Sequence, residues 1–172
     1  AAHVEEQLGQ QIPYILDGGR CDVGIESTIV GFDRDGTVLH RMGGLSQEAI
    51  EKITGPVSVR PYSNSNPVAP GQLLSHYAPR VKVIIGKLED LLQQYPAHTS
   101  GLLSFNKDFN SPYQFILSTT GSMEEAAHNL FRALPEFDKM PIDTVLAELV
   151  PDTGLGRAIN HRLPTAASLD EE

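Results

Sequence analysis

The sequence is poor in residues on which several protein classes depend. Its 172 residues include one cysteine, Cys21, and no tryptophan. A single cysteine excludes an intramolecular disulfide framework and a cysteine-based zinc cluster, and it fits a reducing compartment. No apolar run approaches the roughly 20 residues that a membrane-spanning helix needs, and no secretory leader is recognisable. We therefore expect a cytoplasmic protein without a membrane span.

Positive charge is also scarce. The chain has 13 Lys and Arg against 22 Asp and Glu, so its formal net charge is -9. Binding to nucleic acid depends on cations that neutralise phosphates, so this balance argues against direct RNA or DNA binding. Apolar residues make up 40% and charged residues 20% of the chain, which is typical of a folded globular protein.

The first 60 residues predict an α+β arrangement. Apolar residues recur at helical spacing up to Gly9, and alternating apolar runs then predict strands. An Asp-Gly pair between two of these runs predicts a hairpin, and Ser46 and Gly55 are suited to cap a helix. The expected elements are a helix at 1–9, strands at 12–19, 26–32 and 37–43, and a helix at 45–55.

Residues 61–80 differ in composition from both flanks. They are rich in Pro, Ser, Asn and Gly, follow no period, and are long for a loop inside a compact domain. We interpret them as an interdomain linker. Its final "HYAP" stretch places His76 beside Tyr77, which favours a specific role over that of a passive tether.

Residues 81–172 predict a small, mostly parallel α/β domain, because strand and helix patterns alternate. Ser122 and Glu125 have the spacing of a capping box at the start of a helix. The segment 142–149 is mostly apolar and fits a strand or a helix equally well. The other expected elements are strands at 81–86, 100–105 and 113–119, and helices at 88–95, 122–134 and 154–168.

Candidate binding residues fall in three places. In "GIESTIV", residues 24–30, the hydroxyls of Ser27 and Thr28 lie beside a glycine and can bind a carboxylate or phosphate, although a polar strand end has the same composition. Arg41 follows the next strand and is either a phosphate ligand or a surface residue. His76 and Tyr77 either contact a nucleotide or pack the linker onto a domain.

Other site signatures are weak. "GLGRA", residues 154–158, lacks the third glycine of a dinucleotide-binding fingerprint and is better interpreted as a helix start. The sequence offers no metal-binding motif and no catalytic triad. We therefore assign no metal ligand and no catalytic nucleophile.

Three motifs together resemble a known family. "ILDGGRCDVGIESTIVGF", "VLHRMGGLS" and "APGQLLSHYAP", in this order, resemble the two-domain threonylcarbamoyl-AMP synthases. The resemblance covers essentially the whole chain. It implies the C-terminal part of a YrdC-like α+β catalytic domain at 1–60, a linker or lid at 61–80, and a small Rossmann-like α/β domain at 81–172.

The resemblance also implies a reaction. L-threonine, bicarbonate and ATP give threonylcarbamoyl-AMP and pyrophosphate, with Mg2+ accompanying ATP, and transfer proteins then modify an adenosine of tRNA. Ser27 and Thr28 correspond to the L-threonine site. The ATP contacts correspond to Arg41, His76 and Tyr77.

The family's Lys/Arg elements and its Ser-Ala-Asn segment lie before the region that this chain matches, so the segment alone is expected to be inactive. The linker departs from the family pattern at Ala69, Gln72 and Leu74, and Leu74 replaces a tyrosine that contacts the nucleotide. A non-catalytic module that senses a nucleotide or docks a partner is the alternative function.

Overall fold

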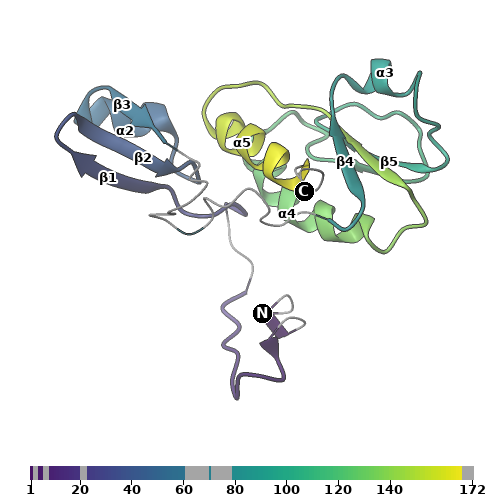
Figure 1. Cartoon of the computed structure of the whole chain (residues 1–172), viewed down its shortest axis with the longest axis horizontal. Coiled ribbons are helices and arrows are strands. Elements are labelled where there is room, and N and C mark those ends of the chain that lie inside the picture. The colour runs from purple at the N-terminus through teal and green to yellow at the C-terminus, as the bar shows by residue number, and fades with distance from the viewer. Residues whose placement is uncertain (2–3, 6–7, 20–22, 61–69, 71–78, 168–172) are drawn as a thin grey trace.

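The computed structural model describes residues 1, 4–5, 8–19, 23–60, 70 and 79–167. Two separate sheets organise them (Figure 1). The first sheet and helix α2 lie at one end of the molecule, and the second sheet with helices α3, α4 and α5 lies at the other. The segment before residue 20 extends away from both.

The first sheet has the strand order β1-β2-β3. Strands β1 (Ile29–Asp33) and β2 (Gly36–Arg41) form the antiparallel hairpin that the Asp-Gly turn predicts. Helix α2 (Gln47–Thr54) then leads to β3 (Val57–Val59), which pairs with β2 in parallel. The strand β3 was not predicted, because three residues are too few to show a period.

Helix α2 begins and ends where its capping residues predict. The Oγ atom of Ser46 accepts a hydrogen bond from Ala49 N at 3.3 Å. Gly55 follows the helix and donates its N–H to Glu51 O at 3.0 Å. The helix turns Ile50 into the core and leaves charged residues on the opposite face.

The second sheet is parallel throughout and has the order β4-β7-β5-β6, which confirms the predicted fold class. One of its two inner strands, β7, comes from the segment that fitted a strand or a helix equally well. Both faces of β7 are covered, so its last three residues, 145–147, are apolar without alternation. The strands are β4 (Lys82–Ile85), β5 (Ser100–Ser104), β6 (Gln114–Ile116) and β7 (Thr144–Ala147).

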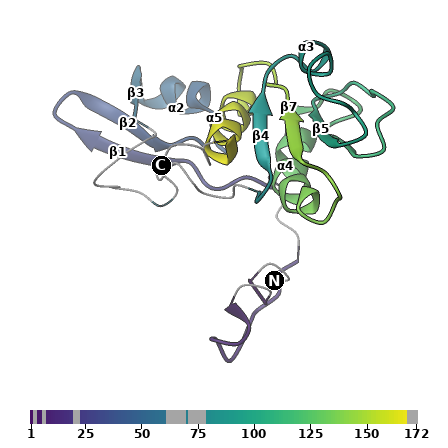
Figure 2. The ribbon, with the colours of Figure 1, turned by 45° about the vertical axis from the view of Figure 1, so that its right-hand side comes forward.

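Helices cover both faces of this sheet (Figure 2). On one face, strand residues such as Leu103 and Val145 pack with α4 (Met123–Phe137) and α5 (Leu155–Ala167). On the other face, Leu102 and Leu146 pack with α3 (Leu88–Leu91). Neighbouring residues of a strand thus enter opposite cores, as the pleat requires.

One predicted strand is wrong. Among the described residues, 12–19 form no strand, and the side chains of Tyr14 and Leu16 are 86% and 96% exposed. A strand needs a neighbour to satisfy its backbone groups, and the described residues supply none beside this segment. Within the same described ranges, no helix is long and apolar enough to cross a bilayer.

Candidate functional site

The segment that begins "GIEST" runs between the two halves of the molecule before it enters β1. Gly24 has a positive φ of 74°, and a Cβ atom there would lie 2.2 Å from the Cα of His128 in α4. Ile25 packs against the core formed by the second sheet with α4 and α5. The residues just before Ser27 are therefore docked on the second half.

Ser27 and Arg41 lie in direct contact. Arg41 Nε donates to Ser27 O, and Arg41 Nη2 donates to Ser27 Oγ, both at 2.9 Å. The hairpin causes this contact, because its register places Ile29 of β1 opposite Arg41 at the end of β2. The structure thus brings together a predicted threonine ligand and a predicted ATP ligand.

Thr28 has a different environment from that of Ser27. Its Oγ1 atom donates to Leu45 O at 2.6 Å and accepts from Leu45 N at 3.0 Å. Gly43 permits this close approach, since a Cβ atom there would lie 2.2 Å from Glu26 O. The Thr28 hydroxyl therefore ties two backbone segments together beneath the exposed Ser27.

Arg41 also reaches the predicted linker. Its Nη1 atom donates to the carbonyl oxygen of Pro70 at 3.2 Å. An arginine carries five N–H donors, and these three contacts engage three of them. The predicted contacts of His76 and Tyr77 lie outside the described residues.

An ion pair beside this site was not predicted from the sequence. Arg162 of α5 lies 2.9 Å, Nη2 to Oε2, from Glu26. The side chain of Arg162 is 2% exposed and that of Glu26 is 20% exposed. The partners are 136 positions apart in the sequence, so no local pattern links them.

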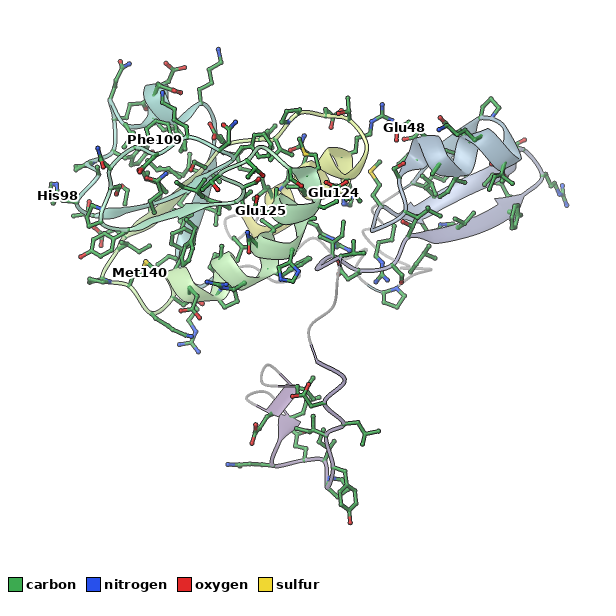
Figure 3. The ribbon with its side chains drawn as sticks, turned by 180° about the vertical axis from the view of Figure 1, so that it is seen from behind. Glu48, His98, Phe109, Glu124, Glu125 and Met140 are labelled. Atoms are coloured by element: carbon green, nitrogen blue, oxygen red, sulfur yellow. The ribbon has the colours of Figure 1, made fainter. Side chains whose placement is uncertain are left out.

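A second, more exposed contact joins the two halves at α2. Arg157 Nη2 lies 3.4 Å from Glu48 Oε1, and Arg157 Nη1 donates to Gln47 Oε1 at 3.1 Å. Figure 3 shows Glu48 on the side of α2 that faces α5. Bonds from its own backbone N–H and from that of Gly154, with the charge of Arg157, lower the pKa of Glu48.

The "GLGRA" segment forms a helix start and not a dinucleotide loop. Helix α5 begins at Leu155 after Gly154, whose φ is 54°. Arg157, in the first turn of α5, contacts α2. The interpretation as a helix N-terminus is confirmed.

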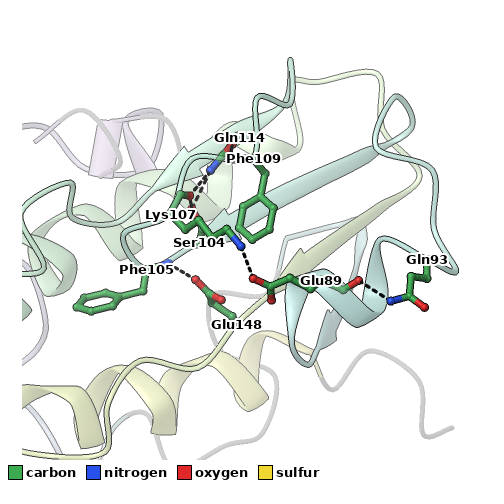
Figure 4. Close-up of polar contacts among 8 residues, drawn as sticks. All are labelled: Glu89, Gln93, Ser104, Phe105, Lys107, Phe109, Gln114 and Glu148. Carbon is green, nitrogen blue, oxygen red and sulfur yellow. Dashed lines mark hydrogen bonds and ion pairs between the residues drawn. The ribbon is translucent and has the colours of Figure 1, made fainter.

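The carboxyl edge of the second sheet is the place where open α/β sheets bind ligands. Here its polar groups bond to each other (Figure 4). Glu148 Oε1 accepts from Phe105 N at 2.7 Å, and Lys107 Nζ lies 2.5 Å from Glu89 Oε1. Lys107 Nζ also lies 4.7 Å from the ring centre of Phe109. These contacts stabilise the loops at this edge without converging on a ligand position.

The polar groups of the turn before α4 also bond to each other. Ser118 is buried; its Oγ atom accepts from Ser122 N at 2.8 Å and lies 2.5 Å from Glu125 Oε2. Hydrogen bonds from Ser118 and then Thr120 lower the pKa of Glu125. Figure 3 places Glu125 at the start of α4. The polar cluster therefore fixes a helix end.

The described residues do not fit a metal held by the protein itself. Among them, no group of three or more His, Cys, Asp or Glu gathers at one place. Glu26, the carboxylate next to Ser27, is paired with Arg162.

Comparison with known sequences gives one consistent family. Residues 45–168 match the family described as threonylcarbamoyl-AMP synthase, C-terminal domain. The chain is 34% identical over 180 residues to the threonylcarbamoyl-AMP synthase of Bacillus subtilis. It is 35% identical over 182 residues to that of Pyrococcus abyssi. Each alignment covers 97% of this chain but 52% and 53% of the relatives, so the chain spans about half their length.

Solved structures agree with this result. The crystal structure of Pyrococcus abyssi Sua5 complexed with L-threonine matches with a TM-score of 0.84 and 34% identity. The match covers 97% of this chain and 53% of that one. A second Pyrococcus abyssi Sua5 structure matches with a TM-score of 0.81 and 31% identity, over 96% of this chain and 52% of the other.

Proposed function

The chain belongs to the threonylcarbamoyl-AMP synthase family, and we propose that it forms the C-terminal portion of such an enzyme. The proposed reaction converts L-threonine, bicarbonate and ATP into threonylcarbamoyl-AMP and pyrophosphate. The observation that carries the proposal is the contact of Ser27 with Arg41, which joins the two predicted substrate sites. A relative of 34% identity and the same fold has been crystallised with L-threonine, which supports the threonine site.

The chemistry has two stages. The threonine amine and bicarbonate combine into a carbamate with loss of water. A carbamate oxygen then attacks the α-phosphorus of ATP, and pyrophosphate leaves with the bonding electrons. Neither stage needs a protein nucleophile, so the site acts by positioning and by offsetting charge.

Ser27 and Arg41 are suited to these tasks. The exposed hydroxyl of Ser27 offers a donor and an acceptor to the threonine carboxylate or hydroxyl. Arg41 has two N–H donors beyond the three engaged by Ser27 and Pro70, and a fixed guanidinium suits a phosphate oxygen. Ser27 orients Arg41, so binding of threonine at Ser27 is coupled to the position of the guanidinium that contacts ATP.

We assign Thr28 a supporting role, since both of its hydroxyl contacts go to the backbone of Leu45. His76 and Tyr77 are proposed as nucleotide contacts of a linker that covers the site and excludes water from the labile anhydride. The contact from Arg41 to Pro70 supports a linker that runs over the site.

Mg2+ is proposed to enter with ATP and to offset the charge of its phosphates. The proposed product serves proteins that transfer the threonylcarbamoyl group to tRNA. The segment alone is proposed to be inactive, because the Lys/Arg elements of the family precede the matched region.

The test uses the protein expressed from the complete open reading frame that encodes this chain. Pyrophosphate release is measured with ATP, bicarbonate and L-threonine, and with each omitted. Release that requires all three is the expected result. Absence of threonine-dependent release contradicts the proposal, and saturable ATP binding without turnover would then favour a nucleotide-sensing module.

Ser27→Ala in the same protein separates the substrate roles. The KM for threonine should rise roughly tenfold, as expected for one lost hydrogen bond, while the KM for ATP changes less. Ser58→Ala, at an exposed position of β3, is the matched control and should leave both unchanged. An unchanged KM for threonine in Ser27→Ala would remove Ser27 from the threonine site.

A further inference from the structure

Helix α5 of the second half contacts the segment 24–28 through the side chain of Arg162. The guanidinium of Arg162 is buried and lies 2.9 Å from Glu26 Oε2, one residue before Ser27. A buried guanidinium is costly unless it is paired, and the partly exposed carboxylate of Glu26 supplies such a partner. The pair therefore holds the Glu26 side chain in one position against α5.

Both ends of this connection are firmly held. Arg162 lies between Ile159 and Leu163, which are fully buried in the core shared with α4 and the second sheet. On the other side, Glu26 O accepts from Gly44 N at 2.9 Å, and Gly43 leaves no space between the two segments. A movement of Glu26 would therefore also move the backbone of residues 43–45.

The next residue after Glu26 carries the predicted chemistry. Ser27 holds Arg41 through both its carbonyl oxygen and its hydroxyl. One peptide bond thus separates the buried ion pair from the contact between the two substrate sites. The second contact of α5, from Arg157 to Glu48, joins the halves at α2 and does not involve a residue next to Ser27.

From this geometry we propose that Arg162 is a positioning residue for the substrate site. Through Glu26 it sets the place of Ser27 and the orientation of Arg41. The α/β half is then a structural part of the threonine site and not a separate module attached by a linker. The kinetic part of this proposal rests on the proposed function, whereas its structural part does not.

The structural part is tested by amide hydrogen exchange on this chain. In Arg162→Met, the protection of the Gly44 amide, which bonds to Glu26 O, should fall by roughly tenfold or more, since the local opening becomes easier. Arg157→Met removes the other cation that α5 presents to the first half and is the matched control. It should leave the Gly44 amide unchanged.

A double variant covers the case in which Arg162→Met does not fold. Glu26→Gln with Arg162→Met removes both charges of the pair, so no carboxylate is left without its guanidinium. Loss of Gly44 protection in this variant, with the core amides of α4 still protected, supports positioning. Gly44 protection equal to that of the parent chain overturns the proposal.

The kinetic part is tested in the complete open reading frame. Arg162→Met should raise the KM for threonine by roughly tenfold, because small misplacements of binding groups are costly. Arg162→Lys should restore part of the loss, whereas Arg157→Met should leave the KM unchanged. An active double variant with unchanged KM for threonine overturns the proposal. If the parent protein shows no turnover but Gly44 still loses protection, the proposed function fails and the positioning role stands.

Discussion

At the residue scale, Ser27 and Thr28 are adjacent hydroxyls with different partners. The Ser27 hydroxyl is exposed and contacts a guanidinium. The Thr28 hydroxyl both donates to and accepts from the backbone of Leu45. A substitution at Thr28 should therefore change folding, and a substitution at Ser27 should change ligand binding.

Thr28→Val keeps the side-chain shape but removes the hydroxyl. Leu45 then loses two hydrogen bonds, so the free energy of unfolding should fall by about 1–3 kcal/mol. Urea unfolding of the chain measures this change. Thr28→Ser keeps the hydroxyl and should restore most of the stability. If Thr28→Val were as stable as the parent, the backbone contacts would have no energetic role.

The lowered pKa of His161 makes the stability of the chain depend on pH. Burial, and then the charge of Arg162, lowers the pKa of His161 from 6.5 to about 4. Between these two values the unfolded chain binds a proton that the folded chain does not. This histidine therefore contributes stability that is fully present above pH 6.5 and is lost as the pH falls towards 4.

His161→Gln should flatten this part of the stability curve. Urea midpoints between pH 6.5 and 4.5 should fall less with pH in the variant than in the parent. The lowered pKa values of Glu48 and Glu125 act in a separate window, below their usual value of 4.5. Equal slopes in variant and parent between pH 6.5 and 4.5 would show that His161 is not protected from protonation.

At the element scale, the start of α4 forms only one of the two hydrogen bonds of the predicted capping box. The predicted capping box supplies one of its two bonds, from Glu125 N to Ser122 Oγ at 3.2 Å. The carboxylate of Glu125 turns instead to Ser118 and Thr120. Ser118 in turn accepts from Ser122 N, so the turn from β6 takes over half of the box.

Ser122→Ala should lower the free energy of unfolding by about 0.5–2 kcal/mol, because the Glu125 amide loses its cap. Thermal or urea unfolding of the chain measures the loss. Ser122→Thr, which keeps a hydroxyl that can cap Glu125 N and donate to Glu124 Oε2, is the matched control and should stay close to the parent. Equal stability of Ser122→Ala and the parent would mean that Ser118 alone fixes this helix end.

At the scale of the whole molecule, Gly24 is the point where the first half rests on α4. A Cβ atom at Gly24 would lie 2.2 Å from the Cα of His128, which is backbone and cannot move aside alone. Together with the Glu26–Arg162 pair, this contact fixes how the segment before β1 crosses the second half.

Gly24→Ala should destabilise the chain by more than the strain of its positive φ. Gly55 has a φ of 80° with open space around its Cβ position, so Gly55→Ala carries the strain of about 1–3 kcal/mol without the clash. The difference between the two variants in urea unfolding reports the docking contact. Equal losses would show that the contact with α4 adds nothing.

Local signals in the sequence determined most of the elements. The Asp-Gly turn, the caps Ser46, Gly55 and Ser122, and the alternation of strands and helices predicted the hairpin, α2, α4 and the parallel sheet, because each depends on nearby residues. The resemblance of three ordered motifs to one family predicted Ser27 as a threonine ligand and Arg41 as an ATP ligand, and their direct contact came only from the fold.

Only the tertiary structure decided how the segments are used. The mostly apolar segment 142–149 supplies the inner strand β7 because other elements cover both faces of that strand. The segment 12–19 has no such neighbours among the described residues and forms no strand. In the sequence, Arg162 is one residue of a predicted helix, and only the fold places it against Glu26. Pairings between distant segments depend on packing and burial of the whole chain, and no local pattern in the sequence encodes them.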